Sequence, residues 1–334
     1  MLPAFSIIVP AYNCAPYLVA CVDSILQSGI TNDEIILIND GSDDDTRTVC
    51  DTLALSNPSV KVIHSKHQGV AEARNLGIQE ANNDFILFVD GDDCWTSPFS
   101  LNELRNYISQ QECDLWVYGY RIRKHLKELK PDLIVSCDSR LLYNWRTNLD
   151  FFLSIFQNGL MFPCWNKVFK KSIIASHEIC FKTQQMEDFL FVLDYLEIIS
   201  AVSFLQIEPY VYNKRYDGNS LTATIRPDIT EGTLSCHQRL LSMAGPKMEG
   251  TIHRIMAPQY IAIINKCLSP DNKSSSGQIL KNLQQSILVK KSLDAYNPVS
   301  LSDFISILMM RHAHYGLLSN YQSVVGSSKR ILRK

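Results

Sequence analysis

The sequence lacks any run of 18 apolar residues, so no segment of its 334 residues is predicted to span a bilayer. With 14 Gly, 13 Pro and 46% hydrophobic residues, it is neither disordered nor collagenous. The ten cysteines include no Cys-x-x-Cys pair, and we expect mostly buried free thiols. No signal-peptide pattern, Walker loop or Gly-x-Gly-x-x-Gly segment is present. These absences predict a globular protein of the cytoplasm.

The charge is close to balanced overall and unbalanced along the chain. The formal net charge is −2, from 32 basic and 34 acidic residues, which argues against a nucleic-acid partner. Residues 1–100 hold four basic and fourteen acidic residues, whereas residues 273–334 hold nine basic and two acidic ones. We therefore expect the two ends of the chain to face different partners.

Short apolar runs alternate with helical patterns in the first third of the chain, which is typical of β-α-β units around a parallel sheet. The predicted strands are 5–10, 34–40, 60–64, 84–90 and 114–120. The predicted helices are 16–26, 44–55, 70–81, 101–111 and 187–199. After residue 226 we expect mainly helices, among them 304–318, with a polar loop at 269–277.

Acidic residues gather where two predicted strands end. One strand runs into Asp40 and a further acidic run at 43–45, and another runs into Asp90, Asp92 and Asp93. Ligands of open α/β sheets bind beyond the carboxyl ends of the strands, and carboxylates there offer oxygen ligands to Mg²⁺ or Mn²⁺. The alternative interpretation is that these residues form acidic turns that cap the next helix.

Four ordered segments carry a resemblance to a known family. They are 7–13 (IIVPAYN), 39–46 (NDGSDDDT), 69–77 (GVAEARNLG) and 90–93 (DGDD). Their order and spacing over residues 4–100 resemble the family 2 glycosyltransferases of GT-A fold, although many members have Asp where this chain has Asn39. The resemblance implies an α/β fold with a Rossmann-like, mostly parallel central sheet flanked by helices and a helical C-terminal extension.

The resemblance also implies residues that bind a nucleotide-sugar donor. Pro10, Tyr12, Asn13 and Asp40 would lie at the nucleotide base, with the Asp40 carboxylate accepting a base N–H. A UDP-sugar is the implied donor.

The acidic segment 90–93 is implied to hold the metal. Asp92, together with Asp90, would ligate Mn²⁺ or Mg²⁺ at the donor diphosphate, and Asp90 would lie near the ribose or the metal. Arg74 is a candidate donor-binding residue in an acidic neighbourhood, where it could contact the diphosphate or form an ion pair with a strand-end Asp.

The second half of the chain resembles the same family at the start of the helix 187–199. Its Glu187-Asp188 pair is similar to a motif whose Asp deprotonates the acceptor hydroxyl, so Asp188 is the implied catalytic base. The alternative is that both carboxylates only complement a helix N-terminus. Lys167 and Arg215 lie in two weaker matches and are implied to contact the donor, a surface location for Lys167 being the alternative.

Together these observations predict an inverting, metal-dependent hexosyltransferase. It would move a sugar from a UDP-sugar to a glycan or lipid-linked glycan acceptor in bacterial surface polysaccharide synthesis, such as capsule, O-antigen or lipopolysaccharide. We expect a nucleotide-sugar-binding half (1–105), an acceptor-binding half (106–225) and a mainly helical C-terminal region (226–334). The alternatives are a catalytically silent glycan-binding or scaffold subunit and a sugar nucleotidyltransferase.

The last six residues include four bases, Lys329, Arg330, Arg333 and Lys334. Such a cluster attracts anionic lipid at about 1 kcal/mol per base, which would bring the protein to the inner face of the cytoplasmic membrane as a peripheral protein. A solvated tail is the alternative interpretation.

Overall fold

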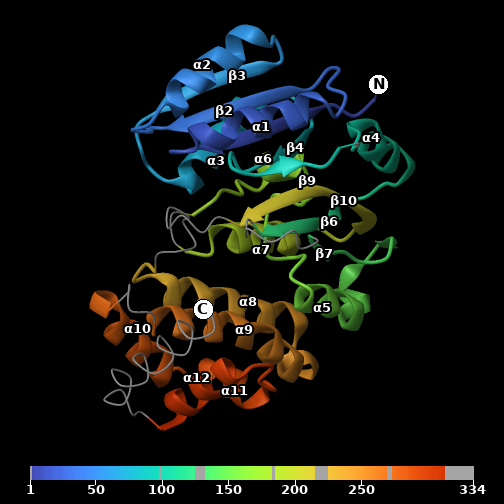
Figure 1. The fold of residues 1–334 in the computed structure, drawn as a ribbon. Helices are drawn as coiled ribbons and strands as arrows, with labels where there is room; N and C mark the ends of the chain where they lie inside the picture. The colour runs from blue at the N-terminus through green and yellow to red at the C-terminus, as the bar shows by residue number, and fades with distance from the viewer. Residues whose placement is uncertain are drawn as a thin grey trace. The chain divides into compact units, whose positions relative to one another are not determined.

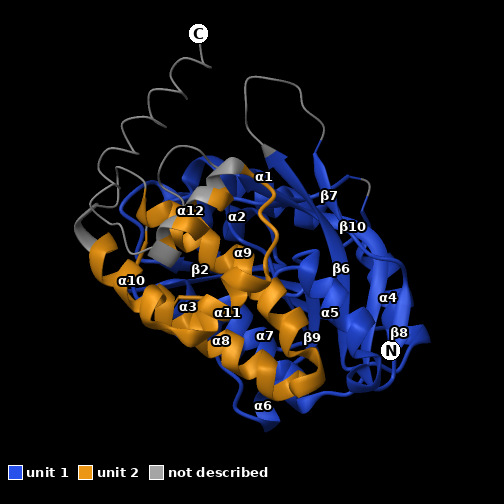
Figure 2. Ribbon diagram, turned by 90° about the horizontal axis from the view of Figure 1, so that it is seen from below, with its two compact units in different colours: residues 1–183, 187–216 blue, residues 184–186, 217–334 orange. Residues whose placement is uncertain are grey.

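The computed structural model describes residues 2–97, 99–124, 132–182, 185–214, 225–268 and 273–312. The chain forms two compact units, coloured separately in Figure 2. Unit 1 comprises Met1–Thr183 with Glu187–Tyr216, and unit 2 comprises Gln184–Met186 with Asp217–Lys334.

Unit 1 is an α/β unit around a ten-stranded sheet, most of whose strands are labelled in Figure 1. Its strands are β1 (Phe5–Ala11), β2 (Glu34–Asp40), β3 (Val60–Ser65), β4 (Phe85–Phe88), β5 (Cys94–Trp95), β6 (Leu115–Lys124), β7 (Leu133–Val135), β8 (Arg140–Leu142), β9 (Lys167–Lys170) and β10 (Val202–Lys214). Its α-helices are α1 (Ala15–Leu26), α2 (Thr46–Ser56), α3 (Val70–Glu80), α4 (Leu101–Gln110), α5 (Leu149–Gln157), α6 (Lys171–Ser176) and α7 (Glu187–Ile198).

The main path of the sheet is β3-β2-β1-β4-β9-β6-β10-β5. Pairing is parallel from β3 to β4 and between β6 and β10. β9 is antiparallel to both neighbours, so β4 and β6 point in the same direction. The predicted mostly parallel sheet is confirmed. β9, α5 and α6 fall where the sequence pattern was irregular, and they were not predicted.

The central strands are covered on both faces, since all seven residues of β1 are buried. α1 carries Pro in its first turn and buries Leu18, Cys21, Val22 and Ile25 at helical spacing. α3 approaches β1 so closely that a Cβ on Gly77 would lie 2.3 Å from Ile8 Cγ2. Glycine at position 77 therefore allows this helix to lie against the strand.

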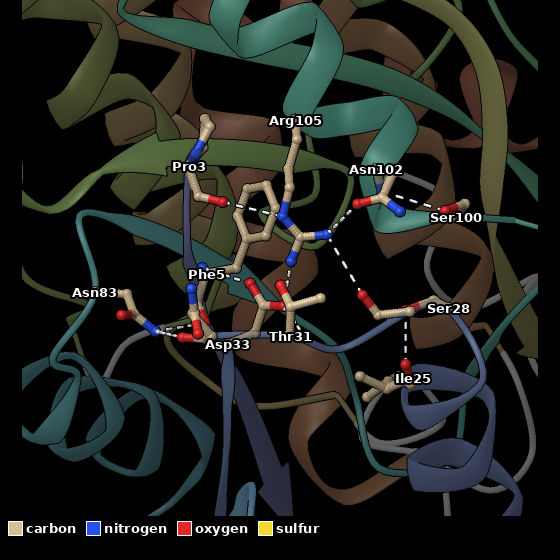
Figure 3. Close-up of polar contacts among 12 residues, drawn as sticks. Pro3, Phe5, Ile25, Ser28, Thr31, Asp33, Asn83, Ser100, Asn102 and Arg105 are labelled. Atoms are coloured by element: carbon tan, nitrogen blue, oxygen red, sulfur yellow. Dashed lines mark hydrogen bonds and ion pairs between the residues drawn. The ribbon is translucent and has the colours of Figure 1, made fainter. Parts of the chain in front are cut away.

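The end of the sheet where β1 and β2 begin is held by a buried ion pair, shown in Figure 3. Arg105 of α4 contacts Asp33, donates from Nε to the Pro3 carbonyl at 3.1 Å and from Nη1 to Asn102 Oδ1 at 2.8 Å. Asp33 also accepts the Phe5 N–H at 2.9 Å. Because the cation and the carboxylate are both paired and hydrogen-bonded, the buried charges are compensated.

Unit 2 is helical in its described part, which agrees with the predicted helical extension. Its α-helices are α8 (Ile229–Ala244), α9 (Glu249–Cys267), α10 (Lys273–Gln285), α11 (Ile287–Ala295) and α12 (Leu301–His312). α9 packs against each of the other four helices. The predicted polar loop 269–277 is wrong from Lys273 onward, where α10 begins. No helix of the described segments has the length and apolar character needed to cross a membrane.

A buried polar cluster lies inside unit 2. His237 Nδ1 is 2.9 Å from the Tyr260 hydroxyl, and the rings of His237 and His253 are 5.0 Å apart. Burial and the neighbouring His253 lower the pKa of His237 to about 4.

Candidate functional site

Asp40 ends β2 and is buried, with 2% of its surface exposed. Its two carboxylate oxygens accept the backbone N–H groups of Gln68 and Gly69, each at 2.8 Å, just before α3. The His67 ring lies 2.9 Å from the same carboxylate. The carboxylate expected to hold a nucleotide base is thus already bound to the segment that leads into α3, and a base N–H would have to share one of its oxygens.

The other residues expected at the base lie near the end of β1. The Tyr12 ring is 38% exposed and stacks on His67, with centroids 4.1 Å apart and planes inclined by 19°. Asn13 links the ends of β1 and β2, because its N–H donates to Ser42 Oγ at 3.1 Å and its Oδ1 accepts the Asp43 N–H at 2.9 Å. Pro10 is buried in β1. An exposed aromatic ring beside polar loops offers a surface on which a planar base can stack.

Arg74 of α3 joins residues from distant parts of unit 1. Its guanidinium contacts Asp188 and lies 2.9 Å from Asp90 Oδ1 and 3.6 Å from Glu187 Oε1. The Arg74 side chain is only 3% exposed, whereas the three carboxylate side chains are 22–26% exposed. The segment after β4 and the start of α7 therefore meet at a single cation. The sequence suggested that Arg74 contacts the diphosphate or pairs with a strand-end Asp. In the structure it pairs with Asp90.

This arrangement, which we call the Arg74 cluster (Arg74, Asp90, Glu187 and Asp188), holds more negative than positive charge. Burial, followed by the charges of Asp188 and Asp92, raises the pKa of Asp90 to about 6 although Arg74 opposes the shift. Burial and Asp188 likewise raise the pKa of Glu187 to about 7. Burial alone would lower the pKa of Arg74, but its carboxylate neighbours raise it well above the ordinary value. A further positive charge at this place would be stabilised.

A divalent cation fits the chemistry of the oxygen atoms here. Asp90 and Asp92 lie on one short loop, and their carboxylates supply hard oxygen ligands. In the described ranges, no three His, Cys, Asp or Glu side chains converge as a metal site. Mg²⁺ and Mn²⁺ commonly take only one or two carboxylates and complete their shell with phosphate and water. The residues present match that pattern.

Lys167 does not lie where contact with a phosphate was expected. Its side chain is fully buried at the start of β9, and Nζ donates to the Leu160 carbonyl at 2.8 Å, the Pro163 carbonyl at 2.5 Å and Asn166 Oδ1 at 2.7 Å. All three N–H groups of an ammonium are thereby used, and burial lowers the pKa of Lys167 to about 7. Its placement supports a role in holding the turn before β9, and the alternative of a surface lysine is wrong. Arg215 lies outside the described residues.

Several polar residues beside the site were not singled out by the sequence. Tyr210 and Asn213 of β10 contact the loop that follows β4, and Cys164 is buried near Arg74 and Asp188. His67 lies against both Tyr12 and Asp40. Proximity to the recognised motif 69–77 could have pointed to His67. Tyr210 and Asn213 lie 120 and 121 positions from the loop residues that they bind, so no local signal could have found them.

Comparison with known proteins adds a family and a fold. The family model described as Glycosyl transferase family 2 matches residues 6–178, more than half of the chain. A Bacillus subtilis protein named as a glycosyltransferase, EpsH, is 27% identical over 215 residues, which cover 63% of this chain and 60% of EpsH. The B. subtilis protein EpsJ, also named as a glycosyltransferase, is 25% identical over 305 residues, covering 88% of this chain and 87% of EpsJ.

Among solved structures, the 1–349 fragment of S. aureus TarS in complex with UDP-GlcNAc superposes with a TM-score of 0.62. The alignment covers 98% of this chain and 92% of that fragment at 20% identity. The two chains share the GT-A fold.

Proposed function

Because the chain belongs to glycosyl transferase family 2, we propose that it is an inverting hexosyltransferase that uses a UDP-sugar and a divalent cation. The acceptor is the hydroxyl group of a glycan or lipid-linked glycan in bacterial surface polysaccharide synthesis. A UDP-GlcNAc complex of TarS, which has the same fold, supports a uridine nucleotide as the donor.

The observation that carries this proposal is the Arg74 cluster. Arg74 pairs with Asp90, on the expected donor side, and with Asp188, the expected base, although Arg74 and Asp188 are 114 residues apart in sequence. A transferase needs the residues that hold the donor and the general base within one site. This cluster brings a candidate for each role together, Asp90 and Asp188.

In the proposed reaction, the acceptor hydroxyl attacks the anomeric carbon from the face opposite UDP. The new C–O bond forms as the bond to the diphosphate oxygen breaks, UDP leaves with the electron pair, and a carboxylate oxygen of Asp188 takes the hydroxyl proton. Arg74 fixes the orientation of Asp188 through Oδ1. A bound Mn²⁺ or Mg²⁺, held by Asp92 and Asp90, would offset charge on the diphosphate.

The donor side of the site would use the surface between the ends of β1 and β2. Tyr12 offers its exposed ring to the uracil, and Asp40, with Pro10 and Asn13, shapes the base-binding edge. Arg215 follows β10 directly in sequence and remains a candidate for the diphosphate.

The test is incubation of the full chain with a panel of UDP-sugars, Mn²⁺ and a lipid-linked glycan acceptor, with released UDP and glycosylated product both measured. We expect turnover with one donor, and Asp188→Asn should lower the transfer rate by about 10² to 10⁴ while UDP still binds. Asp194→Asn is the matched control, since Asp194 lies on the same helix but pairs with Lys182 at 3.2 Å.

Two outcomes would contradict the proposal. Absence of binding and turnover for every nucleotide sugar would refute it. Tight binding of UDP and metal without turnover of any donor would support the silent scaffold subunit instead.

Location at the inner face of the cytoplasmic membrane belongs to the same proposal. The basic residues of 329–334 lie outside the described residues, and their sequence is what supports contact with anionic lipid. Flotation of the full chain with phosphatidylglycerol vesicles should be lost when these four bases are replaced by Gln, and unchanged flotation would exclude the tail as the contact.

A further inference from the structure

The end of β10 holds the loop 90–93 through four hydrogen bonds. Two of them involve the Tyr210 hydroxyl, and two are donated by Asn213. None of the four uses the Asp90 or Asp92 carboxylates, which are the proposed cation ligands. The contacts therefore act on the backbone of the loop and on its last acidic residue, Asp93.

Tyr210 is fully buried, and its hydroxyl serves as donor and acceptor at once. It accepts the Asp90 N–H at 3.1 Å and donates to Asp93 Oδ2 at 2.6 Å. The Tyr210 ring stacks on Trp165, with centroids 4.1 Å apart and planes inclined by 13°. The hydroxyl is thus held in place by the packing of its ring.

Asn213 completes the contact three residues further along β10. Its backbone N–H donates to Asp93 Oδ1 at 2.8 Å, and its side-chain Nδ2 donates to the Asp92 carbonyl at 3.0 Å. Asp93, only 2% exposed, therefore has one donor on each carboxylate oxygen. A buried carboxylate that is bound in this way is a rigid part of the structure.

The opposite side of the loop is held by the end of β1. The Gly91 N–H donates to the Pro10 carbonyl at 3.3 Å, and a Cβ on Gly91 would lie 3.0 Å from Cys14 Sγ and 3.1 Å from that carbonyl. The loop also closes on itself, because the Asp93 N–H donates to the Asp90 carbonyl at 2.9 Å. Because β1 holds one side of the loop, the contacts with β10 restrain its other side.

We propose that Tyr210 and Asn213, the β10 pair, are positioning residues that hold the loop 90–93 in the geometry in which Asp90 and Asp92 bind the cation and the donor diphosphate. This inference rests on the proposed function. Neither residue touches substrate: each acts through the loop backbone and Asp93. Groups that orient metal ligands from behind typically change metal affinity or activity by about 10- to 100-fold when they are removed.

The test compares Tyr210→Phe with Tyr195→Phe in the full chain. Tyr195 is also fully buried, and its hydroxyl likewise accepts a backbone N–H, from Lys170 at 2.9 Å, and donates to an oxygen, the Asp114 carbonyl at 2.9 Å. Both variants lose one buried hydroxyl with two hydrogen bonds. Only Tyr210→Phe releases the loop.

The readout is the dissociation constant of Mn²⁺ in the presence of UDP, measured by calorimetry, together with the Mn²⁺ dependence of transfer and the melting temperature. We expect Tyr210→Phe to weaken Mn²⁺ binding by about 10- to 100-fold, and Tyr195→Phe to leave it within about twofold. Asn213→Ala, which keeps the Tyr210 ring and its packing, should weaken Mn²⁺ binding in the same direction, so the test stands if Tyr210→Phe fails to fold.

Each result bears on the inference. Mn²⁺ affinities that match the wild type in both Tyr210→Phe and Asn213→Ala would overturn it and leave the proposed function intact. Equal loss of affinity in Tyr210→Phe and Tyr195→Phe would also overturn it, because the effect would then be general destabilisation. A wild-type chain that binds neither UDP nor Mn²⁺ would remove the proposed function and this inference together.

Discussion

Two buried arginines lie at opposite ends of the sheet of unit 1, and their surroundings differ. Arg105, where β1 and β2 begin, is 2% exposed, and each of its three nitrogens donates to a carbonyl or carboxylate oxygen. Arg74, at the end where β4 leads into the acidic loop, is 3% exposed, faces three carboxylates, and its Nε has no partner.

The difference separates a stabilising site from a functional one. Asp33 balances Arg105 one to one, and the carbonyl oxygens of Pro3 and Gly29 and Oδ1 of Asn102 accept from the other nitrogens. The Arg74 cluster holds three carboxylates against one cation, and two of these carboxylates have raised pKa values. Such a surplus costs stability, and it is retained where chemistry requires it.

The largest expected effect is on stability, from Arg105→Met. The change leaves the Asp33 carboxylate buried without its cation, so the free energy of unfolding should fall by about 3–5 kcal/mol. Urea denaturation measures this effect. Adding Asp33→Asn removes the uncompensated charge while keeping an acceptor for Phe5, and it should recover part of the loss. Equal stability of the single and double variants would contradict the assignment.

Arg74→Met should show the opposite profile. Loss of the orienting cation should lower the transfer rate by about 100-fold, because Asp188 and Asp90 are no longer held together. Stability should fall by less than in Arg105→Met, since the carboxylates left behind are partly exposed and can take up protons. Initial rates and urea denaturation on the same samples check both parts, and a stability loss as large as that of Arg105→Met would break the comparison.

His237 of unit 2 extends the comparison to a buried base that can lose its charge. Its pKa is lowered to about 4 in the folded protein, against an ordinary value near 6.5. As the pH falls from about 6.5 to about 4, the unfolded chain binds a proton that the folded chain does not, so stability falls by up to about 3 kcal/mol.

The measurement is urea denaturation of the full chain between pH 7 and pH 4. His237→Gln should reduce the loss on the acid side of this range. His177→Gln is the control, because His177 is exposed in unit 1 and far from His237 in sequence. An identical acid-side loss in wild type and His237→Gln would exclude His237 as its source.

The smallest effect is expected from an exposed pair. Lys61 and Glu80 contact each other at 2.5 Å with side chains 44% and 42% exposed. Lys61→Ala should change the free energy of unfolding by less than about 1 kcal/mol, because water screens exposed ion pairs. A larger change would show that burial is not what distinguishes Arg105.

Much of unit 1 could be predicted from the sequence. The strands that became β1 and β2 are buried apolar runs, and α1 shows helical spacing of its buried residues, so local patterns are sufficient there. The positions of Asp40 and Asp90 beside strand ends followed from the same pattern. The family resemblance pointed to Asp188, but its contact with Arg74 could not be derived from spacing.

What the sequence determined by itself is the alternation of strands and helices, the acidic strand ends and the four motifs, because these depend on residue types close together along the chain. Only the tertiary structure decided that β9 lies between β4 and β6, that Lys167 is buried, and that Tyr210 lies on the loop 90–93. These contacts join residues 50 to 117 positions apart, or bury a charge against backbone carbonyls. No local periodicity encodes them, since they depend on how the completed sheet packs.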